Sequence, residues 1–194
     1  NNAIGGRRSR TFPTDSRWEP ILSKMEKGDF LMIQFGLNDD WAINDTIRAR
    51  GTIKGIGQDS LEIDNLITQK HEVVHSFGWY LRKYITEARA KGVEVFVCSQ
   101  VPFCRFENGK VQRKPEYYPL WARQVSEETK ANFIDLHEIS AKEYDKLGQE
   151  EVKKRFFTPK DNVHTNAAGA ELNAQSVVMG IKNMRNSKLR KYLL

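Results

Sequence analysis

An aspartate and a histidine three positions apart carry the clearest chemical signal in this chain. Asp161 and His164 belong to residues 161–169, which read Asp-Asn-Val-His-Thr-Asn-Ala-Ala-Gly. An imidazole can act as general base towards a hydroxyl group, and a nearby carboxylate can fix its tautomer and stabilise the imidazolium. The same spacing also occurs in ordinary surface turns. The motif gains weight from two stretches far upstream.

Those two stretches offer hydrogen-bond donors. Gly5 and Gly6 force a tight turn whose backbone amides are accessible to an anion. Asn38 follows an apolar run, residues 30–35, that is typical of a buried parallel strand. Because ligands of open α/β sheets bind beyond the carboxyl ends of strands, the Asn38 side chain is placed to donate to a substrate. An ordinary turn is the alternative for each stretch.

A third motif points to different chemistry. Residues 71–75 read His-Glu-Val-Val-His and match the H-E-x-x-H pattern of zinc proteases. That pattern requires a helix, so that both histidines project from one face, and a further ligand downstream. The two valines favour extended structure instead, and no H-x-x-G-x-x-H motif follows. A zinc metalloprotease site at His71, Glu72 and His75 is therefore a remote alternative, and we expect no metal or other cofactor.

The length, composition and net charge of the chain limit the class of protein to which it can belong. The chain has 194 residues, and we expect residues 1–194 to form a single domain. Its 39% hydrophobic and 29% charged residues are typical of a globular protein, and no apolar run is long enough to span a membrane. The net charge of +6 is dispersed and no nucleic-acid-binding motif accompanies it, so neither nucleic acid nor a membrane is an expected partner. Cys98 and Cys104 do not identify a redox compartment.

Strands and helices are predicted to alternate along the chain. Apolar runs predict core strands at residues 30–35, 93–98 and 132–136. Helical spacing predicts helices at residues 16–27, 76–91, 117–130 and 167–183, with one or two more between 138 and 156. This order indicates a parallel sheet with helices on both faces.

Three further expectations concern the connections and the last helix. Residues 40–70 are predicted to form an irregular binding loop, and residues 103–116 a polar loop. The apolar face of the last helix is predicted to consist of Ala170, Ala174, Val177, Val178, Ile181 and Met184.

Taken together, the motifs resemble the later conserved blocks of the SGNH (GDSL-like) hydrolases, most of all the rhamnogalacturonan acetylesterases. The matching blocks, in order, are Gly5-Gly6-Arg7, Phe35-Gly36-Leu37-Asn38-Asp39 and Asp161-Asn162-Val163-His164. Residues 1–7, 75–80, 100–102 and 164–170 add similar context, so the resemblance runs nearly from end to end.

The resemblance implies a flavodoxin-like three-layer α/β/α domain that removes acetyl groups from pectic polysaccharide. His164 would be the general base and Asp161 its orienting carboxylate, as in other acyl-transfer triads. The Gly6 amide and the Asn38 side chain would form the oxyanion hole. An acetylated polysaccharide or oligosaccharide would be the substrate, and a secreted or periplasmic location is favoured.

The chain departs from the family pattern in two ways. Leu37 stands where the family usually has histidine. The Gly-Asp-Ser block of the first strand, which carries the nucleophile, has no match. The serines considered in its place, all without the motif, are Ser9, Ser60, Ser76, Ser99 and Ser140. We therefore expect the fold to lack its first strand, the chain to lack a nucleophile, and the exposed sheet edge to favour self-association.

Two interpretations follow from these departures. In the first, the chain is the larger part of an acetylesterase whose N-terminal segment was lost, cleaved or supplied by another chain, and it is weakly active or inactive alone. In the second, it is a non-catalytic relative that binds carbohydrate. Candidate sugar-stacking residues are Trp41, Trp79 and Trp121, although each is more commonly a core residue. Candidate partners of galacturonate carboxylates are Arg7, Arg8, Arg105 and Lys110.

Overall fold

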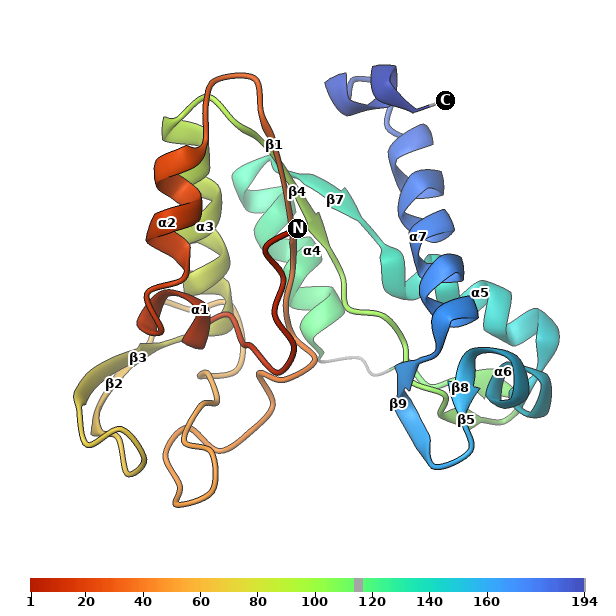
Figure 1. Cartoon of the computed structure of the whole chain (residues 1–194), viewed down its shortest axis with the longest axis horizontal. Coiled ribbons are helices and arrows are strands. Elements are labelled where there is room, and N and C mark those ends of the chain that lie inside the picture. Colours follow the sequence, from red (N-terminus) through yellow and green to blue (C-terminus); the bar gives the residue numbers. More distant parts are fainter. Residues whose placement is uncertain (114–116, 194) are drawn as a thin grey trace.

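A three-stranded parallel sheet forms the centre of the computed structural model, which describes residues 1–113 and 117–193 (Figure 1). The strand order is β1-β4-β7, formed by β1 (Phe30–Gln34), β4 (Glu94–Cys98) and β7 (Asn132–Ile134). The central strand β4 is buried from Val95 to Cys98, because helices cover the sheet on both faces. The predicted α/β fold with a parallel sheet is thereby confirmed.

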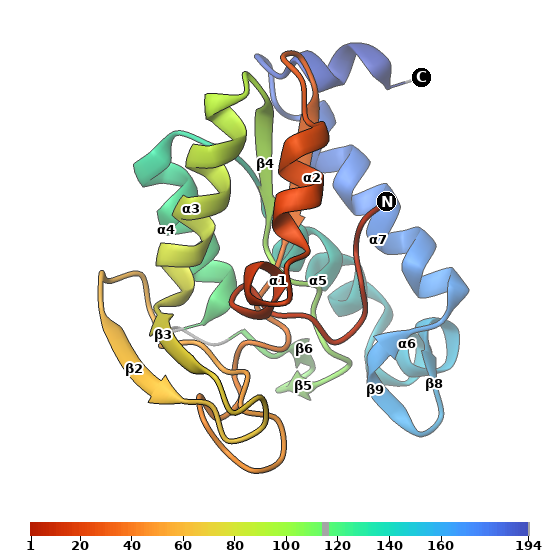
Figure 2. The ribbon, with the colours of Figure 1, turned by 60° about the vertical axis from the view of Figure 1, so that its left-hand side comes forward.

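Helices lie on both faces of the sheet (Figure 2). One face carries α2 (Trp18–Lys24), α3 (Phe77–Ala90) and α4 (Tyr118–Thr129). The other face carries α5 (Leu136–Leu147) and α7 (Ala167–Lys182), with α6 (Gln149–Phe156) beside them. The short helix α1 (Thr11–Thr14) precedes α2, and the 3-10 helix η1 (Lys188–Tyr192) follows α7. The α2, α3, α4 and α7 helices match the sequence prediction to within a few residues.

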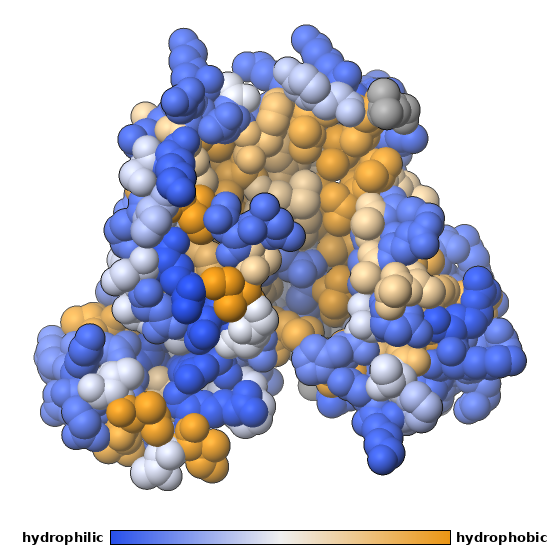
Figure 3. All heavy atoms as spheres, viewed as in Figure 1, coloured by the Kyte–Doolittle hydropathy of each residue, from blue (hydrophilic) through white to orange (hydrophobic). Residues whose placement is uncertain are grey.

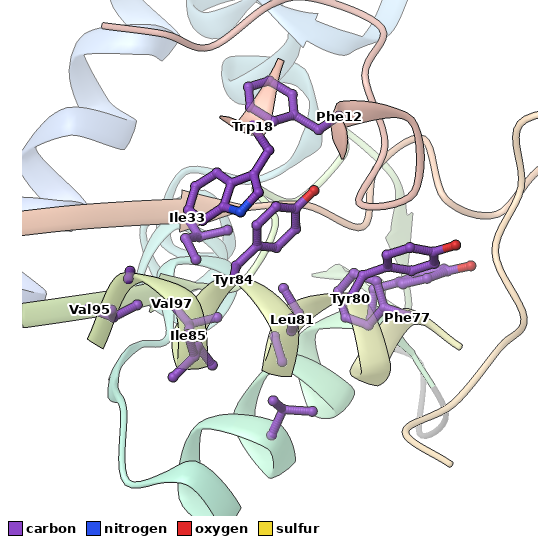
Figure 4. Close-up of a cluster of buried hydrophobic side chains, with 14 of the residues drawn as sticks. Phe12, Trp18, Ile33, Phe77, Tyr80, Leu81, Tyr84, Ile85, Val95 and Val97 are labelled. Atoms are coloured by element: carbon purple, nitrogen blue, oxygen red, sulfur yellow. The ribbon is translucent and has the colours of Figure 1, made fainter. Parts of the chain in front are cut away.

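Helix α3 anchors the larger core cluster (Figure 4). It begins at Ser76, whose hydroxyl accepts a hydrogen bond from the Trp79 amide at 3.1 Å. Its buried residues recur at helical spacing and form one continuous face. From that face, the Tyr84 ring packs edge-to-face against Trp18, with centroids 4.8 Å apart, and stacks on Phe35. This packing holds α2 and the carboxyl end of β1 against α3.

Three antiparallel hairpins lie outside the central sheet. β2 (Ser60–Asp64) pairs with β3 (His71–His75), so the prediction of an irregular segment at residues 40–70 is wrong for β2. β5 (Phe106–Glu107) pairs with β6 (Lys110–Val111) inside the predicted polar loop, part of which lies outside the described residues. β8 (Phe157–Thr158) pairs with β9 (Asp161–Thr165), where the sequence suggested only a tight loop.

Helix α7 uses small residues to approach the sheet. A Cβ atom on Gly180 would lie 2.6 Å from Ile134 Cγ2, so glycine permits this contact. Ser176 and Ile181 are also buried on this face. The predicted apolar face is therefore only partly correct, because three of its residues are exposed. These are Ala170, Ala174 and Val178.

Strand β1 forms an open edge of the sheet. Of the strands in residues 1–113 and 117–193, only β4 pairs with β1. Met32, at the centre of β1, is 43% exposed. A cavity of about 380 Å³ lies along this edge, and Figure 3 shows apolar residues lining the hollow there. Its apolar walls include Trp18, Ile21 and Ile33.

None of the helices in the described part of the chain combines the length and apolarity needed to cross a membrane.

Candidate active site

The Asp161–His164 pair is built within one strand, β9. The imidazole Nδ1 of His164 lies 2.7 Å from Asp161 Oδ2. Asp161 Oδ1 accepts hydrogen bonds from the backbone amides of Val163, at 2.7 Å, and His164, at 3.0 Å. These bonds, led by the one from the His164 amide, lower the pKa of Asp161 to about 2. Because Nδ1 faces a carboxylate, it carries the proton and Nε2 is the basic nitrogen.

The residues after His164 fix the hairpin to α7. Asn166 caps the helix, since its Oδ1 accepts a hydrogen bond from the Gly169 amide at 3.0 Å. Its Nδ2 donates to the carbonyl oxygen of Arg155, also at 3.0 Å. A Cβ atom on Gly169 would lie 2.6 Å from the Phe156 carbonyl oxygen, so glycine allows the helix to start close to α6. Residues 161–169 thus contain both the Asp161–His164 pair and the residues, Asn166 and Gly169, that fix its hairpin to α6 and α7.

One pocket is lined by three of the four site residues predicted from the sequence motifs. Gly6, Asn38 and His164 line a cavity of about 340 Å³ beyond the carboxyl ends of β1 and β4. Asp161 does not line the pocket but is hydrogen-bonded to His164, whose side chain is 78% exposed. The other residues that line the pocket are Ala3, Ile4, Gly5, Arg7, Gln34, Phe35, Gly36, Leu37, Gln100 and Val101. Segments far apart in the sequence therefore meet at the position expected for an open α/β sheet.

Both candidate donor residues line this pocket, and neither donor group has a hydrogen-bond partner among the described residues. Gly6 has a φ of +72°, and within the described residues its amide donates no hydrogen bond. Asn38 is half-buried, and its side-chain amide likewise has no partner among the described residues. Gly36 lets this loop pack closely, because a Cβ atom there would lie 2.7 Å from Tyr118 Cβ. The two donors remain available to a carbonyl oxygen.

The candidate serines are engaged elsewhere. Ser9 is fully buried, and its hydroxyl donates to Asp39 Oδ1 at 2.5 Å. The hydroxyls of Ser76, Ser99 and Ser140 donate to Gly57, Asp135 and residues of α7 respectively. Ser60 lies on β2, outside the pocket. No serine, threonine or cysteine stands among the described residues that line the pocket.

Asp39 belongs to the second matching block, but the sequence analysis assigned it no role. Its carboxylate is fully buried beside Asn38 and accepts three hydrogen bonds. The available signal was its place directly after Asn38, but Ser9, its main partner, lies far away in the sequence.

The H-E-x-x-H segment forms strand β3, not the helix that the zinc motif requires. Four residues of strand span roughly 13 Å, which separates the two histidines too widely for one metal ion. His71 lies 3.1 Å from Asp64, and His75 stacks on Trp79 with ring centroids 3.8 Å apart. Within residues 1–113 and 117–193, no three acidic, histidine or cysteine residues cluster as metal ligands.

The candidate sugar-binding residues lie in different environments. Trp41 is 45% exposed, and the Arg48 guanidinium lies 4.2 Å from its ring centroid. Trp79 and Trp121 pack against the main core cluster. Among the basic candidates, Arg8 is only 1% exposed and Arg7 pairs with Asp15. Arg105 stacks over the Phe103 ring, and Lys110 is exposed on β6.

Comparison with known proteins finds a family model that matches most of the chain, and relatives of similar sequence. The model described as the GDSL-like lipase/acylhydrolase family matches residues 1–172. The chain is 26% identical over 181 residues to the rhamnogalacturonan acetylesterase of Emericella nidulans, covering 93% of this chain and 72% of that protein. It is 29% identical over 187 residues to the probable rhamnogalacturonan acetylesterase YesY of Bacillus subtilis, covering 95% and 76%.

Solved structures agree on the fold. The Bacillus subtilis protein YxiM superposes with a TM-score of 0.72 at 24% identity, covering 94% of this chain and 44% of that chain. The acetylxylan esterase Axe2 of Geobacillus stearothermophilus superposes with a TM-score of 0.55 at 18% identity, covering 95% and 73%. At these identities the likeness shows a shared fold.

Proposed function

Because the chain belongs to the GDSL-like lipase/acylhydrolase family, we propose that its pocket serves to remove acetyl groups from a pectic polysaccharide. One observation carries the proposal: His164, hydrogen-bonded to Asp161, shares a pocket with Gly6 and Asn38, two donors without a partner among the described residues. The names of two relatives, a rhamnogalacturonan acetylesterase and a probable rhamnogalacturonan acetylesterase, support the choice of substrate. The fold shared with an acetylxylan esterase is compatible with it.

In the proposed reaction, a hydroxyl oxygen attacks the acetyl carbonyl carbon. His164 Nε2 takes the hydroxyl proton and returns it to the sugar oxygen that leaves, so the acetyl group is transferred to the attacking hydroxyl. Water then attacks this ester with His164 again as the base, which releases acetate and restores the hydroxyl. Asp161 stays ionised and stabilises the imidazolium. The Gly6 amide and the Asn38 side chain donate to the carbonyl oxygen as it becomes negative, and each such donor is worth about 3 kcal/mol.

The attacking hydroxyl is the part that the described residues do not bring to the pocket. We propose that it belongs to a segment outside residues 1–194 that pairs with the open edge of β1. A strand running parallel to β1 would end beside Gly36, at the pocket. The apolar cavity along the edge offers the volume for such a strand.

Acyl transfer to a small alcohol tests the base and the donors without that hydroxyl. We expect added methanol to accelerate release of nitrophenol from nitrophenyl acetate, with methyl acetate as the second product. The methanol oxygen bonds to the acetyl carbon, the bond to the nitrophenolate oxygen breaks, and the methanol proton passes through His164 to the departing nitrophenolate. His164→Ala should reduce this rate by about 10²-fold or more. His71→Ala, at an exposed histidine on β3, should leave it unchanged.

Two outcomes would contradict the proposal. A methanol-dependent rate that is equal in His164→Ala and the unmodified chain would reject the general base. Rapid hydrolysis without methanol, with one acetyl group found by mass spectrometry on a serine of this chain, would reject the external nucleophile.

A non-catalytic carbohydrate-binding protein is the second candidate, favoured by the exposed Trp41 ring backed by Arg48. In that case, binding of acetylated rhamnogalacturonan fragments would survive His164→Ala and fall in Trp41→Ala, while methanol would have no effect on ester cleavage. Calorimetry with acetylated and deacetylated fragments measures the binding.

A further inference from the structure

A single buried carboxylate connects the two segments that carry the oxyanion donors. Asp39 follows Asn38 and is 0% exposed. Its Oδ1 atom accepts hydrogen bonds from the Ser9 amide at 3.0 Å and the Ser9 hydroxyl at 2.5 Å. Its Oδ2 atom accepts from the Gly36 amide at 3.0 Å. Each oxygen therefore serves a different segment.

The first segment is the Gly-Gly turn. Ser9 lies three residues after Gly6, and its carbonyl oxygen accepts a hydrogen bond from the buried Tyr84 hydroxyl at 2.6 Å. Arg8 Nη1 donates to the Gly6 carbonyl oxygen at 3.0 Å. The peptide groups around the Gly6 amide are thus fixed through side chains, although Gly6 itself is exposed and has open space around it.

The second segment is the loop after β1. Gly36 lies in this loop, and the hydrogen bond from its amide to Asp39 Oδ2 closes a tight turn around Asn38. The Asp39 carbonyl oxygen also accepts from the Thr52 amide at 3.3 Å. Asp39 is thereby fixed by its backbone as well as its side chain, and Asn38 lies inside the fixed turn.

Only a carboxylate satisfies all the donors that meet here. The Ser9 amide, the Ser9 hydroxyl and the Gly36 amide present three hydrogens to two oxygen atoms. An asparagine in place of Asp39 would turn one of those oxygens into an NH2 group, which would face a donor. A carboxylate without these bonds would be costly to bury, since burial disfavours the charged form.

The groups that interact electrostatically with Asp39 include the Arg8 guanidinium and several phenols. Burial raises the pKa of Asp39 to about 6, although the hydrogen bonds from Ser9 and Gly36 and the charge of Arg8 oppose the rise. Arg8 is itself buried, and within the described residues its Nε and Nη2 atoms have no hydrogen-bond partner. The phenols that interact electrostatically with Asp39 are Tyr80, Tyr84 and Tyr118.

We infer that Asp39 is the positioning residue of the oxyanion hole: its carboxylate fixes the Gly6 amide relative to the Asn38 side chain. The roles of Gly6 and Asn38 as oxyanion donors rest on the proposed function. The mechanical coupling of the two segments through Asp39 does not, and it can be measured without any substrate.

A pH titration followed by ¹H–¹⁵N NMR measures the coupling. The His164→Ala variant serves as the background, because it removes the imidazole that lines the same pocket as Gly6 and Asn38. The Ser9 and Gly36 amides report on Asp39 directly. We expect the Gly6 amide and the Asn38 side-chain NH2 signals to shift with the same midpoint, near pH 6, and to stop shifting when Asp39→Asn is added.

Ser9→Ala provides a milder second variant, which removes only the hydroxyl donor. Loss of a hydrogen bond to the charged form should raise the common midpoint by about one pH unit in all reporters. This variant decides the question even where Asp39→Asn does not fold.

The inference is overturned if the Ser9 and Gly36 amides titrate while the Gly6 and Asn38 signals stay constant. It is also overturned if Ser9→Ala raises the midpoint of the direct reporters alone. Failure of acyl transfer to methanol would reject the proposed function but leave the NMR coupling standing, so the two results are distinguishable.

Discussion

Two aspartates of the pocket region respond to pH in opposite ways. Asp161 sits on the surface hairpin, where hydrogen bonds from His164 and Val163 lower its pKa to about 2. Asp39 is buried, and burial raises its pKa to about 6. Asp161 therefore keeps its charge throughout the range in which Asp39 becomes protonated. Acid is expected to weaken the fixed geometry of the donors before it affects the carboxylate behind His164.

The raised pKa of Asp39 predicts the direction of a change in stability. Between the ordinary value of 3.8 and about 6, the folded state binds a proton that the unfolded state does not. The free energy of unfolding of the unmodified chain, relative to Asp39→Asn, should therefore increase as the pH falls from 7 to 4. The increase should approach about 3 kcal/mol, at 1.36 kcal/mol per pKa unit. Urea unfolding at several pH values measures it.

Asp45→Asn is the matched control. Asp45 accepts backbone hydrogen bonds, first from Arg48, and its pKa is lowered. The stability that it contributes is present at neutral pH and declines as the pH falls below the ordinary value. A pH trend of the same sign in both variants would contradict the account of Asp39.

At the residue level, the sequence motifs located the pocket but not its internal support. Asp161 and His164 lie on one short strand, and Asn38 lies in the loop that follows another, so local spacing was enough to place them. Their chemical roles stay predictions. The hydrogen bond from the Ser9 hydroxyl to Asp39 joins positions 30 residues apart, and no local sequence pattern predicts it. Sequence periodicity indicates local secondary structure and does not predict such long-range contacts.

At the level of elements, strands and helices with a strong apolar periodicity were predicted correctly from the sequence, and those with a weak apolar periodicity were not. The core strands and α3 were predicted because their apolar residues are dense and regular. Strand β2 has only two apolar residues, and pairing with β3 supports it, so tertiary context outweighed its sequence. In α7, glycine and serine form part of the buried face, which a search for apolar residues passes over.

The loop after β1 gives a test at this level. Gly36→Ala combines a φ of +121° with a Cβ atom 2.7 Å from Tyr118 Cβ. We expect a loss of about 2–4 kcal/mol in the free energy of unfolding, from backbone strain and overpacking together. Gly109→Ala is the control, because Gly109 has a φ of +77° but open space around it. Its cost should be about 1 kcal/mol.

Equal losses in the two glycine variants would contradict the close packing of Gly36 against α4. Thermal and urea unfolding, measured side by side, separate these results.

At the level of the whole molecule, the family predicted from the ordered motifs is confirmed by the model that matches residues 1–172. Single-domain organisation and the absence of a nucleophile stay predictions. Strand β1 forms an open edge of the central sheet, and an apolar cavity lies along it. Unpaired strand edges of this kind favour association with another strand.

Met32→Lys tests association through that edge. Met32 is 43% exposed at the centre of β1. A lysine there should weaken self-association by at least about tenfold, because a charge buried at the contact costs more than ~1.4 kcal/mol. Sedimentation velocity over a range of concentrations measures the change. Ile47→Lys, at a loop residue that is 77% exposed, is the control.

Equal effects of the two lysine variants would show that general surface charge, and not the β1 edge, governs association.

The open edge of β1 also determines the kinetic order of the proposed reaction. A hydroxyl carried by a strand of a separate polypeptide would make the deacetylation rate rise with the concentration of that polypeptide and then saturate. A hydroxyl carried on the same polypeptide would make the specific rate independent of dilution, since the local concentration of the strand is fixed by its tether. A dilution series thus distinguishes assembly between molecules from closure within one.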